Sequence, residues 1–292
     1  MNSIKQSIHE KPLENASRSI GAILIDAGRL SPEQVESILR LQKKEGTRFG
    51  DAALKLGFVS DDDIRFALAR QFDYPYLPVG DSSLGSELVA AYKPFSQVVE
   101  NLRALRTQLM LRWFDTNAGR KSLAIVSPDN GDGRSFIAAN LAVVFSQLGE
   151  RTLLIDTDLR HPKQKALFKL SGTAGLSDVI AGRAGQEAVV RIPSLLGLSV
   201  LAAGAVPPNP QELLGRANFP DLLDTLGKNF DVVILDTPAA SDYADGQTVA
   251  ARAGAALMIA RKDQSSTPAL VRLARNLQQA GTRVVGSVLN DV

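Results

Sequence analysis

The sequence predicts an α/β domain, with a mostly parallel sheet flanked by helices, that follows a small, mainly helical repeat domain. Three apolar runs that resemble buried strands predict the sheet: SLAIVSP, RTLLIDTDLRHP and FDVVILDTPAA, at residues 122–128, 151–162 and 230–240. Polar residues end each run, as they do where parallel strands of open sheets meet their ligands. A sequence repeat between residues 19 and 71 predicts the helical domain.

The composition limits the classes of function. The chain has 292 residues, of which 45% are hydrophobic, enough for one large or two ordinary domains with real cores. A formal net charge of +2 without long runs of one sign argues against a nucleic-acid partner and a polybasic membrane segment. The absence of cysteine excludes disulfides and thiolate metal sites. Because neither a signal-peptide core nor an apolar run of about 18 residues occurs, we expect a cytoplasmic protein.

The repeat consists of residues 19–42 and residues 48–71, which align without gaps. Glycines and capping serines recur at equivalent positions, so each copy predicts a short helix closed by glycine and then a Ser-capped helix with apolar residues at helical spacing. Two such hairpins bury little alone, and we expect them to pack together as one domain over residues 18–77. Residues 1–17 are expected to form a flexible N-terminus.

The repeat resembles the MshEN domain, the N-terminal domain of type II secretion and type IV pilus assembly ATPases. Its paired 24-residue motifs, separated by five residues, start with Arg, Leu, Gly and end with Gln. The resemblance implies a cyclic di-GMP site at Arg18, Gly21, Gln42, Arg48, Gly50 and Gln71. Arginine can stack on guanine or hold phosphate, and glycine allows close approach of the backbone. The first copy has Ser19 where the motif has arginine, with Arg18 one position away, so a helical docking module without ligand is the favoured interpretation.

Residues 78–95 are rich in Pro, Gly and Ser and predict a linker. From residue 96 onwards an amphipathic helix is expected, and it opens the nucleotide-binding domain of residues 96–292. Glu100, Arg103 and Arg106 recur on this helix at spacings of three. Without further information they form a solvated face with local charge pairs.

The stretch SPDNGDGRSF, residues 127–136, lies between the first predicted strand and a helix, as in the loop that holds phosphate in P-loop NTPases. Gly131 and Gly133 allow the chain to curl around phosphates, and Ser135 can offer a hydroxyl to magnesium. Arg134 occupies the usual lysine position. The residues expected to bind nucleotide are Asn130, Gly131, Asp132, Gly133, Arg134, Ser135 and Phe136.

Asp156, Asp158 and Asp236 end two of the predicted strands. Clustered carboxylates at that edge of a sheet are costly unless a cation meets them, and hydrated Mg²⁺ bound to phosphate is the expected occupant. Capping of a turn explains one aspartate but not three beside a glycine loop. The sequence therefore predicts a site for ATP and Mg²⁺, with Ser135, Asp156 and Asp236 as the metal ligands.

These motifs resemble those of bacterial tyrosine kinases that control exopolysaccharide chain length, of the EpsG type. LLIDTDLRHP corresponds to their Walker A′ motif and VVILDTP to Walker B, and GLSDVIAG, PPNPQELL and Glu100-x-x-Arg103-x-x-Arg106 also match. The resemblance implies that Arg134, Asp156, Asp158 and Asp236 are catalytic, with Asp158 helping to deprotonate the incoming tyrosine. It implies that Glu100, Arg103 and Arg106 mediate side-by-side association, which can form a ring.

The resemblance also implies a partner, an inner-membrane polysaccharide co-polymerase that holds the kinase at the cytoplasmic side of the membrane. Arg134 keeps the charge of lysine but is bulkier, so ATP binding is expected to survive better than turnover. Relatives carry a C-terminal cluster of tyrosines, and the printed sequence has only Tyr74, Tyr76, Tyr92 and Tyr243. Two alternatives stay open: an ATP-binding assembly switch without tyrosine phosphorylation, and a cyclic di-GMP receptor compatible with either.

Overall fold

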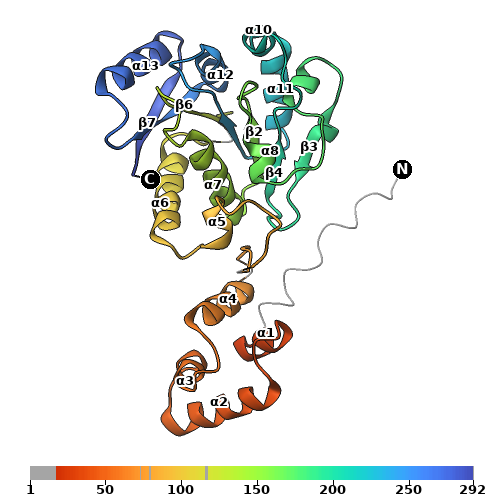
Figure 1. Cartoon of the computed structure of the whole chain (residues 1–292), viewed down its shortest axis with the longest axis vertical. Coiled ribbons are helices and arrows are strands. Elements are labelled where there is room, and N and C mark those ends of the chain that lie inside the picture. Colours follow the sequence, from red (N-terminus) through yellow and green to blue (C-terminus); the bar gives the residue numbers. More distant parts are fainter. Residues whose placement is uncertain (1–17, 73, 79, 116–117, 292) are drawn as a thin grey trace. The chain divides into compact units, whose positions relative to one another are not determined.

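The computed structural model describes residues 18–72, 74–78, 80–115 and 118–291. It divides into two compact units, with the boundary between Pro78 and Val79 (Figure 1). The unit before the boundary is helical and the unit after it contains the sheet, which confirms the predicted fold class. Within the described residues, no helix has both the length and the apolar character that crossing a bilayer requires.

The described part of the first unit contains four helices, and the two repeat copies have the same local structure. Ser31 and Ser60 each cap the following helix through a capping box, with Gln34 and Asp63 as the reciprocal partners. Each copy thus supplies one short and one longer helix: α1 Ile20–Asp26, α2 Pro32–Glu45, α3 Phe49–Lys55 and α4 Asp61–Gln71.

The two copies interlock, because α1 packs against α4 and α2 packs against α3. Gly21, near the start of the first copy, allows close packing between the copies, because a Cβ there would lie 3.1 Å from the Phe49 ring of the second copy. A Cβ on the equivalent Gly50 would lie 3.4 Å from Ile64, an ordinary contact. The shared core includes the fully buried Leu24 and Ile38. Neither copy encloses this core alone, which is why the repeat occurs as a pair.

The second unit is built on a seven-stranded sheet of order β3-β4-β2-β5-β1-β6-β7 (Figure 1). All neighbouring strands are parallel except β3, which runs antiparallel to β4 at one edge. The strands are β1 Ser122–Val126, β2 Thr152–Asp156, β3 Val189–Arg191, β4 Leu198–Leu201, β5 Val232–Asp236, β6 Ala255–Arg261 and β7 Arg283–Asn290.

Helices cover both faces of this sheet. α7 packs on β1, β2, β4 and β5, and α6 lies on α7, whereas α12 and α13 pack on β1, β6 and β7. Alternate residues of β1 serve the two faces, since Ala124 and Val126 join the core beneath α12 and α13. The helical elements of this unit are α5 Val89–Tyr92, α6 Gln97–Arg112, α7 Arg134–Gln147, α8 Gln164–Leu167, α9 Leu176–Ile180, η1 Gln186–Ala188, α10 Pro210–Gly215, α11 Asn218–Gly227, α12 Asp245–Ala253 and α13 Thr267–Gln279.

The segment 78–95, whose composition predicts a linker, differs from that expectation after residue 79. Leu84, Leu88, Ala90 and Ala91 are buried, and the segment carries the short helix α5, which packs on α7. The side chain of Asn140 on α7 accepts from the Ala90 N–H at 2.9 Å and donates to the Glu87 carbonyl at 2.9 Å. Long-range contacts of this kind are not visible in a Pro, Gly and Ser composition.

Candidate active site

The glycine loop joins β1 to α7 and requires its two glycines. Gly131 and Gly133 have φ angles of +84° and +99°, in the left-handed region that other residues rarely adopt. A Cβ on Gly133 would also overlap the Nδ2 atom of Asn290, the last residue of β7. That Nδ2 donates to the Asp132 carbonyl at 3.0 Å, so the end of β7 rests directly on the loop.

Asp132, expected from its position to bind nucleotide, has its carboxylate occupied by the protein. It is 2% exposed, and its Oδ2 accepts from the Asp129 N–H at 2.9 Å. Its Oδ1 accepts from the Ser265 hydroxyl at 2.7 Å. These bonds tie the loop to the turn between β6 and α13, so the Asp132 side chain shapes the loop.

Arg134, in the usual lysine position, is the first residue of α7 and is 7% exposed. Its Nε donates to the Thr237 carbonyl at 2.9 Å, and its Nη1 donates to the Asp129 carbonyl at 2.6 Å and to the Ser127 hydroxyl. Desolvation by burial lowers the pKa of the guanidinium, and the charge of Asp236 opposes this shift. Arg134 thus connects the glycine loop to the residue that follows β5.

The remaining loop residues lie around this arginine. Asn130 is exposed, and its Oδ1 accepts from the Gly131 N–H at 3.1 Å. Ser135 and Phe136 are half-buried in the first turn of α7. The α7 N-terminus and the left-handed glycines therefore stand together, as a phosphate site requires.

Asp156 and Asp236, the last residues of β2 and β5, are directly paired across the sheet and are both fully buried. Burial raises the pKa of Asp156 well above its ordinary value, and the nearby Asp236 adds to the shift. Burial likewise raises the pKa of Asp236 to about 6, against the opposing effects of Gln164, Ser135 and Arg134. Two buried carboxylates side by side disfavour ionisation unless a cation joins them.

The two carboxylates differ in how they are satisfied. Oδ2 of Asp156 accepts from the backbone N–H groups of Lys163 and Gln164, at 3.0 and 2.9 Å, and Oδ1 accepts from the Asp158 N–H at 3.2 Å. Oδ2 of Asp236 accepts from the Gln164 side chain at 2.8 Å. Oδ1 of Asp236 is buried without a hydrogen-bond partner.

Asp158 lies in the turn after β2 and is 8% exposed. Its Oδ1 accepts from the backbone N–H groups of Arg160 and His161, at 3.2 and 2.9 Å. The Arg160 side chain pairs with the buried Asp245 at 2.8 Å and stacks on the Tyr243 ring, 3.7 Å from its centroid. This contact joins the turn after β2 to the start of α12.

Sequence patterns alone do not mark Gln164, Ser265, Asn290, Arg160 or Asp245 as site residues. Gln164 lies six residues after Asp158, beyond the motif itself. Its position at the start of a helix next to the motif could have indicated a site residue. Arg160 lies within the motif, but its partner Asp245, like Ser265 and Asn290, contacts the site from an element that lies 85 or more positions away in sequence. Local patterns carry no signal for such contacts.

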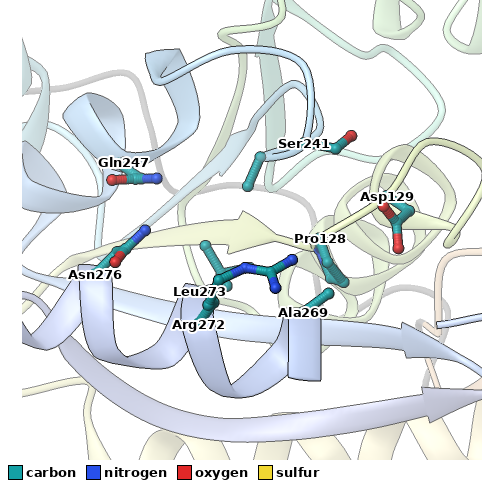
Figure 2. Close-up of a pocket in the computed structure, with 9 residues that line it drawn as sticks. Pro128, Asp129, Ser241, Gln247, Ala269, Arg272, Leu273 and Asn276 are labelled. Atoms are coloured by element: carbon teal, nitrogen blue, oxygen red, sulfur yellow. The ribbon is translucent and has the colours of Figure 1, made fainter. Parts of the chain in front are cut away.

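A pocket of about 80 Å³ adjoins the beginning of the glycine loop, between α12 and α13. Figure 2 shows Gln247 and Asn276 facing each other from these two helices, with Asp129 and Ser241 on the side of the loop. None of the three candidate carboxylates lines it. Its lining consists of Pro128, Asp129, Ala240, Ser241, Gln247, Ala269, Arg272, Leu273 and Asn276.

The candidate association residues lie on α6, and all three make contacts within the chain. Arg106 Nη1 donates to the Val144 carbonyl of α7 at 2.7 Å, and Arg103 pairs with Glu100 at 2.9 Å. The Glu100 side chain is 64% exposed, whereas that of Arg103 is 20% exposed. Glu100 is therefore the member most available to a second copy.

The candidate cyclic di-GMP residues lie in the first unit, where both copies contribute to one place. Gln71, at the end of the second copy, donates from Nε2 to the carbonyl of Arg18, at the start of the first copy, at 3.2 Å. The Arg18 side chain pairs with Asp26 at 3.0 Å and remains 53% exposed. Arg48 is exposed before α3, Gln42 is half-buried on α2, and Gly21 and Gly50 lie in the helix contacts described above.

Comparison with known proteins places this arrangement in a family. No family model matches the sequence. The chain is 31% identical over 207 residues to "Putative tyrosine-protein kinase CapB" of Staphylococcus aureus, covering 71% of this chain and 90% of that protein. It is 32% identical over 212 residues to "Putative tyrosine-protein kinase in cps region" of Klebsiella pneumoniae, covering 73% of this chain but only 29% of that longer protein.

Solved structures agree with these sequence matches. The kinase domain of the Escherichia coli tyrosine kinase ETK superposes with a TM-score of 0.68 at 30% identity, covering 75% of this chain and 89% of that domain. The chimerical protein CapA2B2 superposes with a TM-score of 0.65 at 30% identity, covering 77% of this chain and 97% of that one. Because the match to CapB covers nine tenths of the CapB protein at 31% identity, the chain belongs to the bacterial tyrosine kinase family.

Proposed function

We propose that this chain binds Mg-ATP in the glycine loop and transfers the γ-phosphoryl group to tyrosine hydroxyls. The observation that carries the proposal is the meeting of Asp156, Asp158 and Asp236 beside the N-terminus of α7, with Asp236 Oδ1 buried and unpaired. A buried carboxylate oxygen without a donor is costly unless a ligand completes it. The family membership gives the reaction class.

The residues present fit a magnesium ion bound together with nucleotide. Among the described residues, no three carboxylate, histidine or cysteine side chains form a metal cage of their own. Magnesium commonly takes only one or two carboxylates and fills the remaining positions with water and phosphate oxygens. Asp236, Asp156 and the Ser135 hydroxyl are the groups that would hold it, directly or through water.

The proposed chemistry assigns one task to each part of the site. The backbone N–H groups of residues 131–135 bind the phosphates, and the helix N-terminus adds positive potential. Asp158, the least buried of the three carboxylates, accepts the proton of the incoming tyrosine hydroxyl. Bound magnesium would neutralise charge on the phosphate oxygens. Arg134 contributes a positive charge and holds the loop against Thr237.

Mass spectrometry of the purified full chain after incubation with Mg-ATP, alone and with tyrosine-containing peptides, tests this proposal. We expect phosphotyrosine that is absent in the Asp158→Asn variant, while that variant keeps its affinity for ATP because the carboxylate is removed without a change of shape. ATP binding without phosphotyrosine in the wild type would instead favour the ATP-binding assembly switch.

The membrane partner and self-association are further parts of the proposal. The CapB and cps-region relatives point to capsule or exopolysaccharide production, and we propose a polysaccharide co-polymerase of the inner membrane as the partner. Self-association, up to a ring, would use the exposed Glu100 together with Arg103 and Arg106. Light scattering of wild type and Glu100→Arg in Mg-ATP tests it, and a monomer in both would contradict it.

Cyclic di-GMP binding by the first unit is a second proposal, supported by the Gln71 contact that brings the end of one copy to Arg18 of the other. Titration of the full chain with cyclic di-GMP, with Arg18→Ala and Arg48→Ala as variants, distinguishes cyclic di-GMP binding from a docking module without ligand. We expect micromolar binding that either variant weakens. Absence of binding by the wild type at tens of micromolar would leave the docking module.

A further inference from the structure

Gln164 is a fully buried polar residue that contacts both strand-end aspartates and Ser135 in the candidate active site. Its Nε2 donates to Asp236 Oδ2 at 2.8 Å and to the Ser135 carbonyl at 3.2 Å. Its backbone N–H donates to Asp156 Oδ2 at 2.9 Å. One residue therefore joins the strand-end carboxylates to the first turn of α7.

The hydrogen bonds fix which way the Gln164 amide faces. Asp236 Oδ2 and the Ser135 carbonyl are both acceptors, so the side-chain nitrogen must face them and the oxygen must face away. That oxygen, Oε1, is buried and has no hydrogen-bond partner, as is Oδ1 of Asp236. Two acceptors, on side chains that are hydrogen-bonded to each other, are thus buried without a donor, which is costly unless a ligand completes them.

The position of Gln164 does not depend on the active-site groups alone. It opens α8, whose last residue, Leu167, accepts from the Gly85 N–H at 2.7 Å. Leu167 and the following Phe168 are buried. The packed segment around residue 85 therefore holds α8 against the unit, and the Gln164 side chain enters the site from a fixed helix.

We propose that Gln164 is a positioning residue of the magnesium site, whose Oε1 accepts a hydrogen bond from a magnesium-bound water while its Nε2 orients Asp236. The inference deepens the proposed function and rests on it. Magnesium dehydrates reluctantly and keeps several waters in protein sites, and each water needs an acceptor. Loss of an outer partner of this kind typically costs 10- to 100-fold in metal affinity.

The test measures how much Mg²⁺ tightens nucleotide binding, which a purely structural role would leave unchanged. A fluorescent ATP analogue is titrated into the full chain in excess Mg²⁺ and in EDTA, and the ratio of the two Kd values is compared. Gln164→Met removes both the oxygen and the nitrogen of the amide at nearly constant length, and we expect it to lower the ratio about tenfold with little change of Kd in EDTA. Gln164→Glu keeps an oxygen acceptor, and we expect it to retain the ratio.

Gln147→Met is the matched control, because Gln147 also donates a side-chain hydrogen bond to a carbonyl of this unit, Ala90 at 3.0 Å, but from the far end of α7. We expect its ratio to equal that of wild type. An unchanged ratio in Gln164→Met would overturn the inference alone. An equal loss in Gln164→Glu would assign the effect to the bond between the amide nitrogen and Asp236 and would overturn the role proposed for Oε1. Absence of Mg²⁺-dependent binding in wild type would overturn the proposed function and the inference together.

Discussion

Replacing Arg134 with lysine restores the usual loop residue. We expect this change to lower the free energy of unfolding without lowering the rate of phosphoryl transfer. Arg134 donates three hydrogen bonds, to Thr237, Asp129 and Ser127, through two of its nitrogens. Lysine has a single nitrogen at the end of its chain and cannot reproduce the Nε bond to the Thr237 carbonyl. A hydrogen bond from a charged donor contributes about 1.5 to 3 kcal/mol, so Arg134→Lys should lower the free energy of unfolding by about 2 kcal/mol.

Urea unfolding in the absence of nucleotide measures this loss, which corresponds to a Tm about 4 to 8 °C lower for a domain of 150 to 250 residues. Arg252→Lys on the exposed surface of α12 is the control, and it should stay within about 0.5 kcal/mol of wild type. Phosphate release and phosphotyrosine formation by Arg134→Lys should equal or exceed those of wild type, because a freed amine can follow the moving γ-phosphate.

Two results would refute this reasoning about Arg134. A lysine variant as stable as wild type would mean that the three hydrogen bonds do not hold the loop. A variant that loses both stability and phosphoryl transfer, with ATP affinity reduced in parallel, would mean that the guanidinium itself is the main phosphate ligand.

Three further predictions concern separate features. Burial raises the folded-state pKa of Asp236 from 3.8 to about 6, so folding favours the protonated side chain. The contribution of this group to the free energy of unfolding is therefore fully present below pH 4 and is lost as pH rises through 6. Without nucleotide, Asp236→Asn should exceed wild type in free energy of unfolding by up to about 3 kcal/mol at pH 7.5, and urea titrations should show this difference closing towards pH 4. Gly133→Ala should abolish ATP-analogue binding, whereas Gly215→Ala, at a position with open space, should not; equal binding by both would contradict the loop geometry. Ser31→Ala or Ser60→Ala should each cost the first unit about 1 kcal/mol in thermal unfolding without changing ATP affinity, and a change in affinity would count against a role confined to helix capping.

The sequence predicted the parts of the fold that local patterns determine. The runs before Val126, Asp156 and Asp236 form parallel strands as expected, because β-strand burial is visible as a continuous apolar run. The two repeat copies form capped helices because capping and helical periodicity are short-range signals. The packing of residues 80–95 on α7 and α8 was not predicted, since it depends on Asn140 and Leu167, 50 or more positions away in sequence.

In the candidate site, too, local patterns predicted some residues and missed the contacts made by distant elements. Its carboxylates follow strands and could be found, because parallel strands bring their carboxyl ends to one edge of a sheet. The role of the Asp132 side chain could not be predicted from local sequence. Its place in a glycine loop suggested a contact with nucleotide, but its carboxylate accepts a hydrogen bond from the Ser265 hydroxyl, 133 positions later. A side chain that is satisfied by a distant element shapes the loop and leaves the phosphates to the backbone.

Arg134 and Gln164 bear on how this site tolerates its own charge. Three carboxylates meet here. The Asp236 side chain accepts a hydrogen bond from Gln164 at 2.8 Å, and the Ser135 side chain and the charge of Arg134 also lower the pKa of Asp236. None of these groups neutralises Asp156, whose pKa burial and Asp236 both raise. The charges of Arg134 and Arg160 both interact with Asp158, but burial still disfavours the ionised forms of Asp156 and Asp236. A divalent cation would relieve this at the point where Asp236 Oδ1 and Gln164 Oε1 lack donors. The dependence of nucleotide binding on Mg²⁺ should accordingly be set by these two acceptors more than by Arg134.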